Sequence, residues 1–222
     1  MSKPLLTASS LSLSRQGQTL LKAISLTLYE GQTTVLIGHN GAGKSLLLHA
    51  LHGLISTDKG SIENLALQDQ KMVFQKPILL RRTALAHFQF AAQNKDISVA
   101  DYWFNKAKLA DKKTVAARAL SAGEQQKLAM ISALATKPVL LFLDEPTANL
   151  DQESTNDIEQ LIQQAKDDGT AIMMISHSLK QAERLADRII FMHHAEVFDD
   201  SIAKDFFAGH HSQEAQLFIT ER

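Results

Sequence analysis

Residues 33–45, TTVLIGHNGAGKS, decide the fold of this chain. The first five are apolar or β-branched with almost no polar relief, which predicts a strand buried on both faces of a sheet. A glycine-rich loop follows, and residues 46–54 then space Leu and Ala as a helix does. The order strand, glycine loop, helix is typical of a phosphate-binding unit in an α/β protein.

The loop itself fits the pattern G-x-x-x-x-G-K-S/T. In such a loop backbone N–H groups surround the phosphates of a nucleotide, the lysine contacts the outer phosphates and the last hydroxyl binds Mg²⁺. The helix that follows adds the positive end of its dipole. A glycine-rich turn that merely opens a helix is the alternative, and it leaves the preceding strand unexplained. The residues expected to bind the nucleotide are Gly38, His39, Asn40, Gly41, Ala42, Gly43, Lys44 and Ser45.

The rest of the chain alternates between strand and helix patterns. Residues 11–28 alternate apolar and polar side chains around Gly17, which predicts an antiparallel hairpin, and residues 83–120 have a helical composition. Further strands are expected at 60–64, 71–74, 139–143, 171–175 and 188–192, and further helices at 121–135, 152–166 and 179–186. We therefore predict an α/β fold of the P-loop NTPase type, with a mainly parallel sheet core, an N-terminal antiparallel β subdomain and a helical subdomain insertion.

The simplest organisation is one domain over residues 1–222. The inserted helical subdomain is expected at about 83–135, and the tail at about 201–222 is expected to form two short helical pieces. The sequence contains no repeat, linker or low-complexity segment that would argue for a division.

The composition excludes several classes of protein. A hydrophobic fraction of 45% excludes a wholly disordered chain, and a net charge of −1 gives no overall attraction to nucleic acid, which is not an expected partner. Cysteine is absent, which excludes disulfides and thiol catalysis and suits a reducing compartment. Because the sequence has no signal-peptide region and no apolar run of about 20 residues, we expect a cytoplasmic chain. A function at a membrane would need another chain to supply the span.

Two carboxylates follow an apolar strand. Residues 139–143, VLLFL, run directly into Asp144, Glu145 and Pro146. The carboxyl edge of a parallel sheet is where α/β proteins bind their ligands, so Asp144 is placed to hold Mg²⁺ and Glu145 to polarise an attacking water as a general base. Acidic residues that merely end a strand before a proline are the alternative.

The sequence contains further motifs besides the glycine-rich loop and the acidic pair. Residues 120–127, LSAGEQQK, open a helix between these two sites, residues 149–151, NLD, follow the acidic pair, and Gln75 and His177 each follow a predicted strand. In this order the motifs resemble those of the ATP-binding subunit of ABC transporters, over residues 11 to about 199. A simple P-loop kinase would lack the Ser-x-Gly-Glu segment and the histidine.

The resemblance implies ATP and Mg²⁺ as cofactors and a role for each motif residue. Gln75 is implied to contact Mg²⁺ or the attacking water, and His177 to act on the γ-phosphate as a catalytic residue beside Glu145. Asp151 is implied to act across a dimer. The signature residues, implied to close over the ATP of an opposite subunit, are Ser121, Ala122, Gly123 and Glu124. The expected magnesium ligands are Ser45, Gln75 and Asp144.

Some of these residues also have plain structural explanations. Ser121 and Glu124 have the spacing of a helix capping box, which is compatible with the implied role because a capped helix N-terminus itself binds anions. Without the other motifs, His177 would be expected to be an ordinary histidine of a turn or of the core. The histidine pairs at 193–194 and 210–211 match no family motif, and a solvated surface or edge is expected for them rather than a metal site.

The sequence departs from the family pattern at two places. The family signature usually has two glycines and a glutamine, where this chain has Ala122 and Glu124. Because a glutamate is unfavourable beside a phosphate, Glu124 is expected to point away from ATP and cap its helix. Arg15 stands where the family usually has an aromatic residue that stacks on adenine. A guanidinium plane can also stack on a base, and a solvated charge at the hairpin tip is the alternative.

The function implied is that of an ATPase subunit that energises transport. Two copies are expected to dimerise around two ATP at the cytoplasmic face of the inner or plasma membrane, together with transmembrane permease subunits and a substrate-binding protein. The apolar and basic stretch 75–82, QKPILLRR, is expected to be helical and to dock a permease, with an ordinary amphipathic surface helix as the alternative.

The transported solute is less well defined. Residues 74–77 and the tail around 206–218 are similar to ATPases of bacterial oxyanion importers such as tungstate or phosphate systems, which favours an oxyanion. An efflux ATPase and a soluble ABC ATPase that acts on nucleic acid or ribosomes are the alternatives. Soluble relatives of the second kind usually carry paired nucleotide domains or long coiled-coil insertions, for which 222 residues leave no room.

Overall fold

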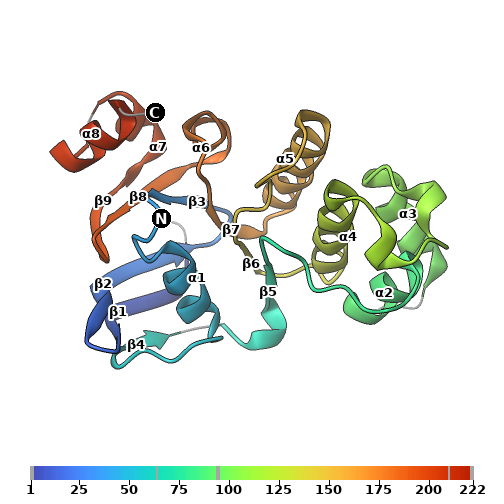
Figure 1. Cartoon of the computed structure of the whole chain (residues 1–222), viewed down its shortest axis with the longest axis horizontal. Coiled ribbons are helices and arrows are strands. Elements are labelled where there is room, and N and C mark those ends of the chain that lie inside the picture. Colours follow the sequence, from blue (N-terminus) through green and yellow to red (C-terminus); the bar gives the residue numbers. More distant parts are fainter. Residues whose placement is uncertain (1–2, 64, 94–95, 210, 221–222) are drawn as a thin grey trace.

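A six-stranded sheet forms the centre of the described part of the chain (Figure 1). The computed structural model describes residues 3–63, 65–93, 96–209 and 211–220. The strands of this sheet are β3 (Thr33–Gly38), β5 (Gln70–Val73), β6 (Leu140–Leu143), β7 (Ala171–Ile175), β8 (Arg188–His193) and β9 (Glu196–Ile202). They lie in the order β5-β6-β7-β3-β8-β9, and all are parallel except β9, which runs antiparallel to β8. Every residue of β3 is buried, as its apolar sequence predicts.

A second, antiparallel sheet contains the predicted N-terminal hairpin. Its strands are β1 (Pro4–Arg15), β2 (Gln18–Tyr29) and β4 (Lys59–Glu63), in the order β2-β1-β4. The turn between β1 and β2 consists of Gln16 and Gly17, whose φ angles of 52° and 80° are those of a type I′ turn. The hairpin is therefore confirmed, although β1 begins seven residues before the predicted start at Leu11.

The helices fall into groups at different places in the fold. They are α1 (Lys44–His52), α2 (Ala84–Ala91), α3 (Ile97–Lys106), α4 (Ala122–Leu134), α5 (Gln152–Asp167), α6 (Leu179–Leu185), α7 (Ala203–Phe207) and α8 (Gln213–Thr220), with 3₁₀ turns at Leu67–Asp69, Ala110–Lys112 and Ala117–Ala119. α2 and α3 lie at one end of the molecule and α7 and α8 at the other (Figure 1). No helix within the described ranges is both long and apolar enough to cross a bilayer.

Side chains of the central sheet point alternately into two apolar clusters. In β6, Leu140 and Phe142 belong to the cluster shared with β1, β2 and α1, whereas Leu141 and Leu143 belong to the cluster shared with helices α2 to α8. The antiparallel sheet and α1 thus cover one face of the central sheet, and helices α4 to α8 lie against its other side. Helices α2 and α3 pack against α4 and not directly on the sheet (Figure 1). This arrangement confirms the predicted α/β fold class, including its antiparallel and helical parts.

Strand β9 corrects the predicted structure of the C-terminal region. The sequence pattern placed no strand after residue 192 and assigned helix from about 201, yet β9 extends to Ile202. Asp199 and Asp200 are residues that disfavour strands, so local propensity gives no signal here. Tertiary contacts form the strand despite this low propensity. β9 pairs with β8 in antiparallel register, and Arg188 Nε forms an ion pair with Asp200 at 2.5 Å.

The stretch 75–82 also differs from its prediction. It contains no helix and instead forms an irregular connection between β5 and Thr83, the N-cap of α2. Pro77 has no backbone N–H to donate and restricts the residue before it, which explains why the amphipathic pattern does not become a helix.

Substitutions at Gly38 and Gly17 distinguish the cost of backbone strain from the cost of a steric clash. A Cβ at Gly38 would lie 2.1 Å from the carbonyl oxygen of Met192 on β8, whereas a Cβ at Gly17 would meet nothing within 4 Å. Both glycines have positive φ, so alanine is strained at either position. We expect Gly38→Ala to lower the free energy of unfolding by at least about 3 kcal/mol and Gly17→Ala by about 1 kcal/mol, measured by urea denaturation. Equal losses in the two variants would contradict the close packing of β3 against β8.

Candidate functional site

The glycine-rich loop connects β3 to α1 and holds a buried lysine. Gly43, the N-cap of α1, has a left-handed φ of 97° and provides no side-chain cap, so the first N–H groups of α1 face the loop. Lys44 is 6% exposed, and its Nζ donates hydrogen bonds of 2.9 Å to the carbonyl oxygens of both Gly38 and His39. The loop therefore combines a positive charge with the positive end of a helix, which is the arrangement that binds phosphates.

The carboxylate of Asp144 lies against the start of α1. Ser45 Oγ donates a 3.0 Å hydrogen bond to Asp144 Oδ1, and His49 Nε2 lies 3.3 Å from Asp144 Oδ2. The two residues predicted as magnesium ligands from the loop and from β6 are thus adjacent, although 99 positions separate them. Sequence reasoning missed His49, and its only signal was its place one helical turn after Ser45.

Glu145 is at the centre of a second group of polar side chains. It follows β6 with a left-handed φ of 47°, a conformation that non-glycine residues adopt at a cost. Gln75 Nε2 donates to Glu145 Oε2 at 2.9 Å, and His177 Nε2 lies 2.5 Å from Glu145 Oε1. The structure therefore brings together three predicted site residues that follow three neighbouring strands, β5, β6 and β7.

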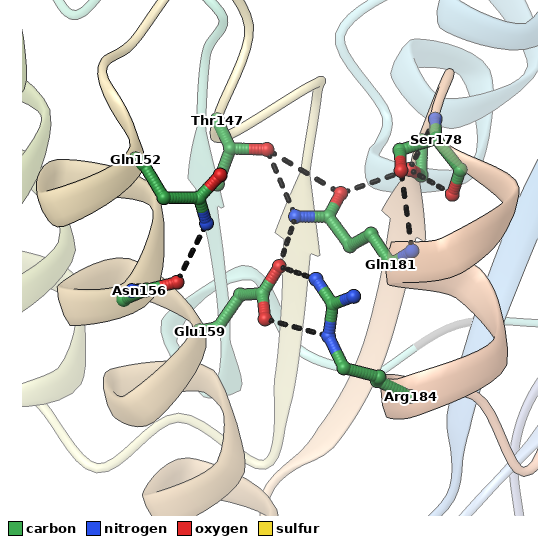
Figure 2. A network of polar contacts seen from close by, with 8 residues as sticks. Thr147, Gln152, Asn156, Glu159, Ser178, Gln181 and Arg184 are labelled. Atoms are coloured by element: carbon green, nitrogen blue, oxygen red, sulfur yellow. Dashed lines mark hydrogen bonds and ion pairs between the residues drawn. The ribbon is translucent and has the colours of Figure 1, made fainter.

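A buried glutamine of α6 connects the segments that carry Glu145 and His177 (Figure 2). Gln181 is 3% exposed, and its Nε2 donates to Thr147 Oγ1 at 2.9 Å and to Glu159 Oε1 at 3.0 Å. Its Oε1 accepts a 2.8 Å hydrogen bond from Ser176 Oγ, directly before His177. One side chain thus binds the loop after β6, the end of β7 and helix α5. The sequence did not predict this role of Gln181, because a glutamine within a helix matches no motif.

These residues line one cleft of about 750 Å³. One part of the lining comes from the phosphate loop, Gln75, Glu145 and His177. A second part comes from β2 and the segment between β8 and β9, namely Gln18, Thr19, Leu20, His194 and Ala195. Arg15 is not part of this lining, since its Nη1 donates to Asp58 Oδ1 at 3.1 Å and to the Ser14 carbonyl at 2.8 Å.

The signature and D-loop residues lie outside the cleft but next to each other. A Cβ at Gly123 would lie 2.2 Å from Ser154 Oγ, and the same hydroxyl donates to Asp151 Oδ2 at 3.0 Å. Asp151 is the N-cap of α5, where it accepts from the Ser154 N–H at 2.7 Å. The N-termini of α4 and α5 are therefore in contact, and glycine is required where they approach.

Ser121 and Glu124 form the predicted capping box. Ser121 Oγ accepts from the Glu124 N–H at 3.3 Å, and Glu124 Oε2 accepts from the Ser121 N–H at 2.8 Å. The N–H of Ser121, aided by Lys112 Nζ at 3.4 Å, lowers the pKa of Glu124 below its usual value. The glutamate is thus held as an anion by its own helix and by a lysine.

Comparisons with known proteins agree with this fold and these motifs. The family model described as ABC transporter matches residues 21–148. The chain is 34% identical to the tungstate uptake system ATP-binding protein TupC of Peptoclostridium acidaminophilum, over 84% of this chain and 94% of the relative. It is 28% identical to the glutamine transport ATP-binding protein GlnQ of Bacillus subtilis, over 90% of this chain and 91% of the relative.

Solved structures show the same fold. A structure described as an ATP-binding subunit of an ABC transporter superposes with a TM-score of 0.85, at 23% identity and 98% coverage of both chains. The structure of cbiO1 from Clostridium perfringens, part of the ABC transporter complex cbiONQ, superposes with a TM-score of 0.80 at 24% identity, covering 99% of this chain and 95% of that one. At these identities the likeness supports the fold alone.

The fold and motifs define a nucleotide-hydrolysing protein of the P-loop class. The chain belongs to the ABC transporter family, as an ATP-binding subunit whose ATPase activity is coupled to transport. The predicted resemblance is thereby confirmed, including the similarity to an oxyanion importer ATPase.

The network around Gln181 gives a test of how the site is positioned. We expect Gln181→Leu to lower kcat for ATP hydrolysis by about tenfold or more with little change in ATP affinity, because the segments that carry Glu145 and His177 lose their common partner. The loss of the Gln181 bonds to Ser176 and Thr147 should also lower the free energy of unfolding by about 1–3 kcal/mol.

The matched control for this test is Gln163→Leu on α5. Gln163 is exposed and bonds only within its own helix, to Asp167 at 2.9 Å, among the hydrogen bonds of the described residues. Steady-state kinetics and ATP binding should be measured for both variants. A kcat for Gln181→Leu equal to that of the control would argue against a positioning role.

Proposed function

We propose that the 750 Å³ cleft binds Mg²⁺ and ATP and hydrolyses the γ-phosphate bond. The observation that carries the proposal is the assembly of Lys44, Ser45, Gln75, Glu145 and His177 on the walls of one cleft. A volume of this size is within the range that small-molecule sites occupy, about 300–1,000 Å³.

The residues present fit a magnesium ion. The Ser45 hydroxyl, the Asp144 carboxylate and the amide oxygen of Gln75 are hard oxygen donors of the kind that Mg²⁺ prefers. The first two already lie within 3.0 Å of each other. When bound, the ion supplies positive charge that offsets the negative charge of the phosphates.

The chain's own groups have separate roles in this proposal. Lys44 and the N–H groups at the start of α1 bind the outer phosphates. Glu145 accepts the proton of the attacking water at its carboxylate, while Gln75 and His177 hold that carboxylate in place through the bonds of 2.9 and 2.5 Å. His39, Asn40, Gly41 and Ala42 complete the loop around the phosphates.

We infer that the complete site needs a second copy of the chain. The signature residues Ser121 to Glu124 and the D-loop residue Asp151 lie outside the cleft of their own chain. A head-to-tail pair related by a two-fold axis brings the N-terminus of α4 in one copy to the phosphate loop of the other, twice. ATP then joins the two copies, and hydrolysis separates them.

The proposed permease contact lies around the connection 75–82. Ile78 is 75% exposed beside a small groove of about 190 Å³, whose walls include Phe74, Pro77 and His87. Phe90 on α2 is 61% exposed, with the Arg82 guanidinium 5.5 Å from its ring centre. Exposed apolar side chains of this size beside arginines are typical of a docking surface.

The proposed setting is an uptake system at the cytoplasmic face of the membrane. The 34% identity to TupC supports an oxyanion such as tungstate as the solute, with permease subunits and a substrate-binding protein as partners.

We also propose that residues 1–222 form one ATPase domain with a helical subdomain at about 83–135 and a tail at about 201–222. The apolar cluster that joins Phe88 and Phe104 to Leu141 of the central sheet supports this organisation.

Two substitutions test the cleft. Glu145→Gln should keep ATP affinity and lower kcat by about 10²–10⁴-fold, because the water loses its base. Lys44→Ala should weaken ATP binding by at least about tenfold, because a charge-assisted contact to phosphate is lost. Binding calorimetry and phosphate release measure the two effects, with Glu183→Gln on the exposed face of α6 as the matched control. Wild-type turnover in Glu145→Gln would refute its role as base.

The docking surface is tested by placing a charge on it. Ile78→Asp should reduce recovery of permease subunits with the tagged chain from detergent-solubilised membranes by about tenfold, since a buried unpaired charge is costly at an interface. Leu217→Asp is the control, because Leu217 is 58% exposed on α8 at the opposite end of the molecule (Figure 1). Equal recovery in both variants would place the contact elsewhere.

The solute is tested on the purified complex of ATPase and permease. Tungstate, phosphate and glutamine are added in turn, each with the substrate-binding protein, and ATP hydrolysis is measured. Stimulation by tungstate or phosphate supports the oxyanion proposal, and stimulation by glutamine alone rejects it. Recovery of the chain with ribosomes or nucleic acid and no permease would reject the uptake proposal.

A further inference from the structure

The lining of the cleft has two parts. The loop with Lys44 and the polar group around Glu145 form the first part, which we call the phosphate end. The second part, which we call the base end, consists of Gln18, Thr19, Leu20, His194 and Ala195. Because a nucleotide is longer than its triphosphate, a nucleotide held at the phosphate end must place its ribose and base against the rest of the lining.

Arg15 is not among the residues that line the base end. Its guanidinium is held by Asp58, which also accepts the Ser14 N–H at 2.7 Å. The N–H of Ser14 and the Arg15 guanidinium together lower the pKa of Asp58, so the partner of Arg15 stays ionised at neutral pH. The side chain predicted to stack on adenine therefore has Asp58 as its partner in this structure.

His194 provides an aromatic face where Arg15 does not. Of the residues that line the cleft, His177 and His194 have aromatic rings. His177 contacts Glu145 at the phosphate end, whereas His194 is exposed at the base end. A planar ring at this place can stack on a nucleotide base, since every base has a π face.

The backbone holds His194 in a demanding conformation. His194 and Ala195 form the two-residue turn between β8 and β9, with φ angles of 44° and 65°. Asn-Gly is the preferred sequence for such a turn, and a non-glycine pair carries strain. The turn is fixed to β2, because the Lys22 N–H donates to the Ala195 carbonyl at 2.9 Å and Lys22 Nζ lies 2.6 Å from Glu196 Oε1.

The ring of His194 is the last of a row of four packed rings. The ring centres of His193 and His194 are 3.9 Å apart, and those of His193 and His39 are 5.2 Å apart. His39 belongs to the phosphate loop and also packs edge-on against Phe218 of α8, at 4.9 Å. Burial, with smaller effects of His194 and His39, lowers the pKa of His193, which keeps the supporting ring neutral at neutral pH. The ring of His194 thus contacts His39 of the phosphate loop indirectly, through His193.

We propose that the ring of His194 stacks on the base of the bound nucleotide, in the place for which the sequence predicted Arg15. The proposal rests on the proposed function of the cleft. It makes the β8–β9 turn, and not the β1–β2 hairpin, the part of the chain that holds the base.

The test compares ATP with inorganic tripolyphosphate, both with Mg²⁺, by binding calorimetry on the full chain. His194→Asn removes the ring but suits the left-handed turn, so folding is preserved. We expect it to weaken ATP binding by about tenfold, as the loss of one base–aromatic stack does, and to change tripolyphosphate binding by less than about twofold. His194→Tyr should retain ATP affinity because it keeps a ring.

Three results would overturn the proposal. Equal weakening of ATP and tripolyphosphate in His194→Asn would mean that His194 contacts phosphate. Unchanged ATP affinity in His194→Asn would mean that it contacts nothing in the nucleotide. A loss in Arg15→Gln that His194→Asn does not show would return the base to the hairpin. Failure of the proposed cleft itself is distinguishable, since Lys44→Ala would then leave both ligands bound as in the wild type.

Discussion

The parallel pairing of β5, β6 and β7 is the constraint on which the site depends. Val73, Leu143 and Met174 are in register across these strands. Gln75 comes two residues after Val73, Glu145 two residues after Leu143, and His177 three residues after Met174. The three side chains therefore meet at one edge of the sheet, although Gln75 is 70 positions and His177 is 32 positions from Glu145 in the sequence. Because side chains alternate between faces, a slip of one residue in this pairing would separate the group.

The parts of the site that could be predicted are those with local patterns. The phosphate loop stands between an unambiguous buried strand and a helix, and Asp144 and Glu145 directly follow the apolar strand β6, so their common location followed from sheet geometry. His49 and Gln181 could not be found in this way. Each acts through contacts with segments far along the chain, and neither residue type is distinctive at its position in a helix.

Strand β9, which the sequence pattern did not predict, shows tertiary structure overriding local preference. β9 forms despite its aspartates because β8 supplies a ladder and Arg188 pairs with Asp200. Arg15 remains a predicted adenine contact, and in this structure it pairs with Asp58, 43 positions away on the segment before β4. Alignment to a family gives the position of a residue along the backbone, but the direction of a long flexible side chain depends on which partner is nearby.

The departure of the signature segment from its family pattern is compatible with phosphate binding in the proposed dimer. The capping box uses the N–H groups of Ser121 and Glu124 and does not use those of Ala122 and Gly123 in the first turn of α4. Glu124 directs its charge to Ser121 and Lys112, which offsets the repulsion that a glutamate would otherwise exert on a phosphate. Ala122 adds only a methyl group and keeps its N–H. The backbone, and not the side chains that vary, is then the part of the signature that meets the nucleotide of the partner copy.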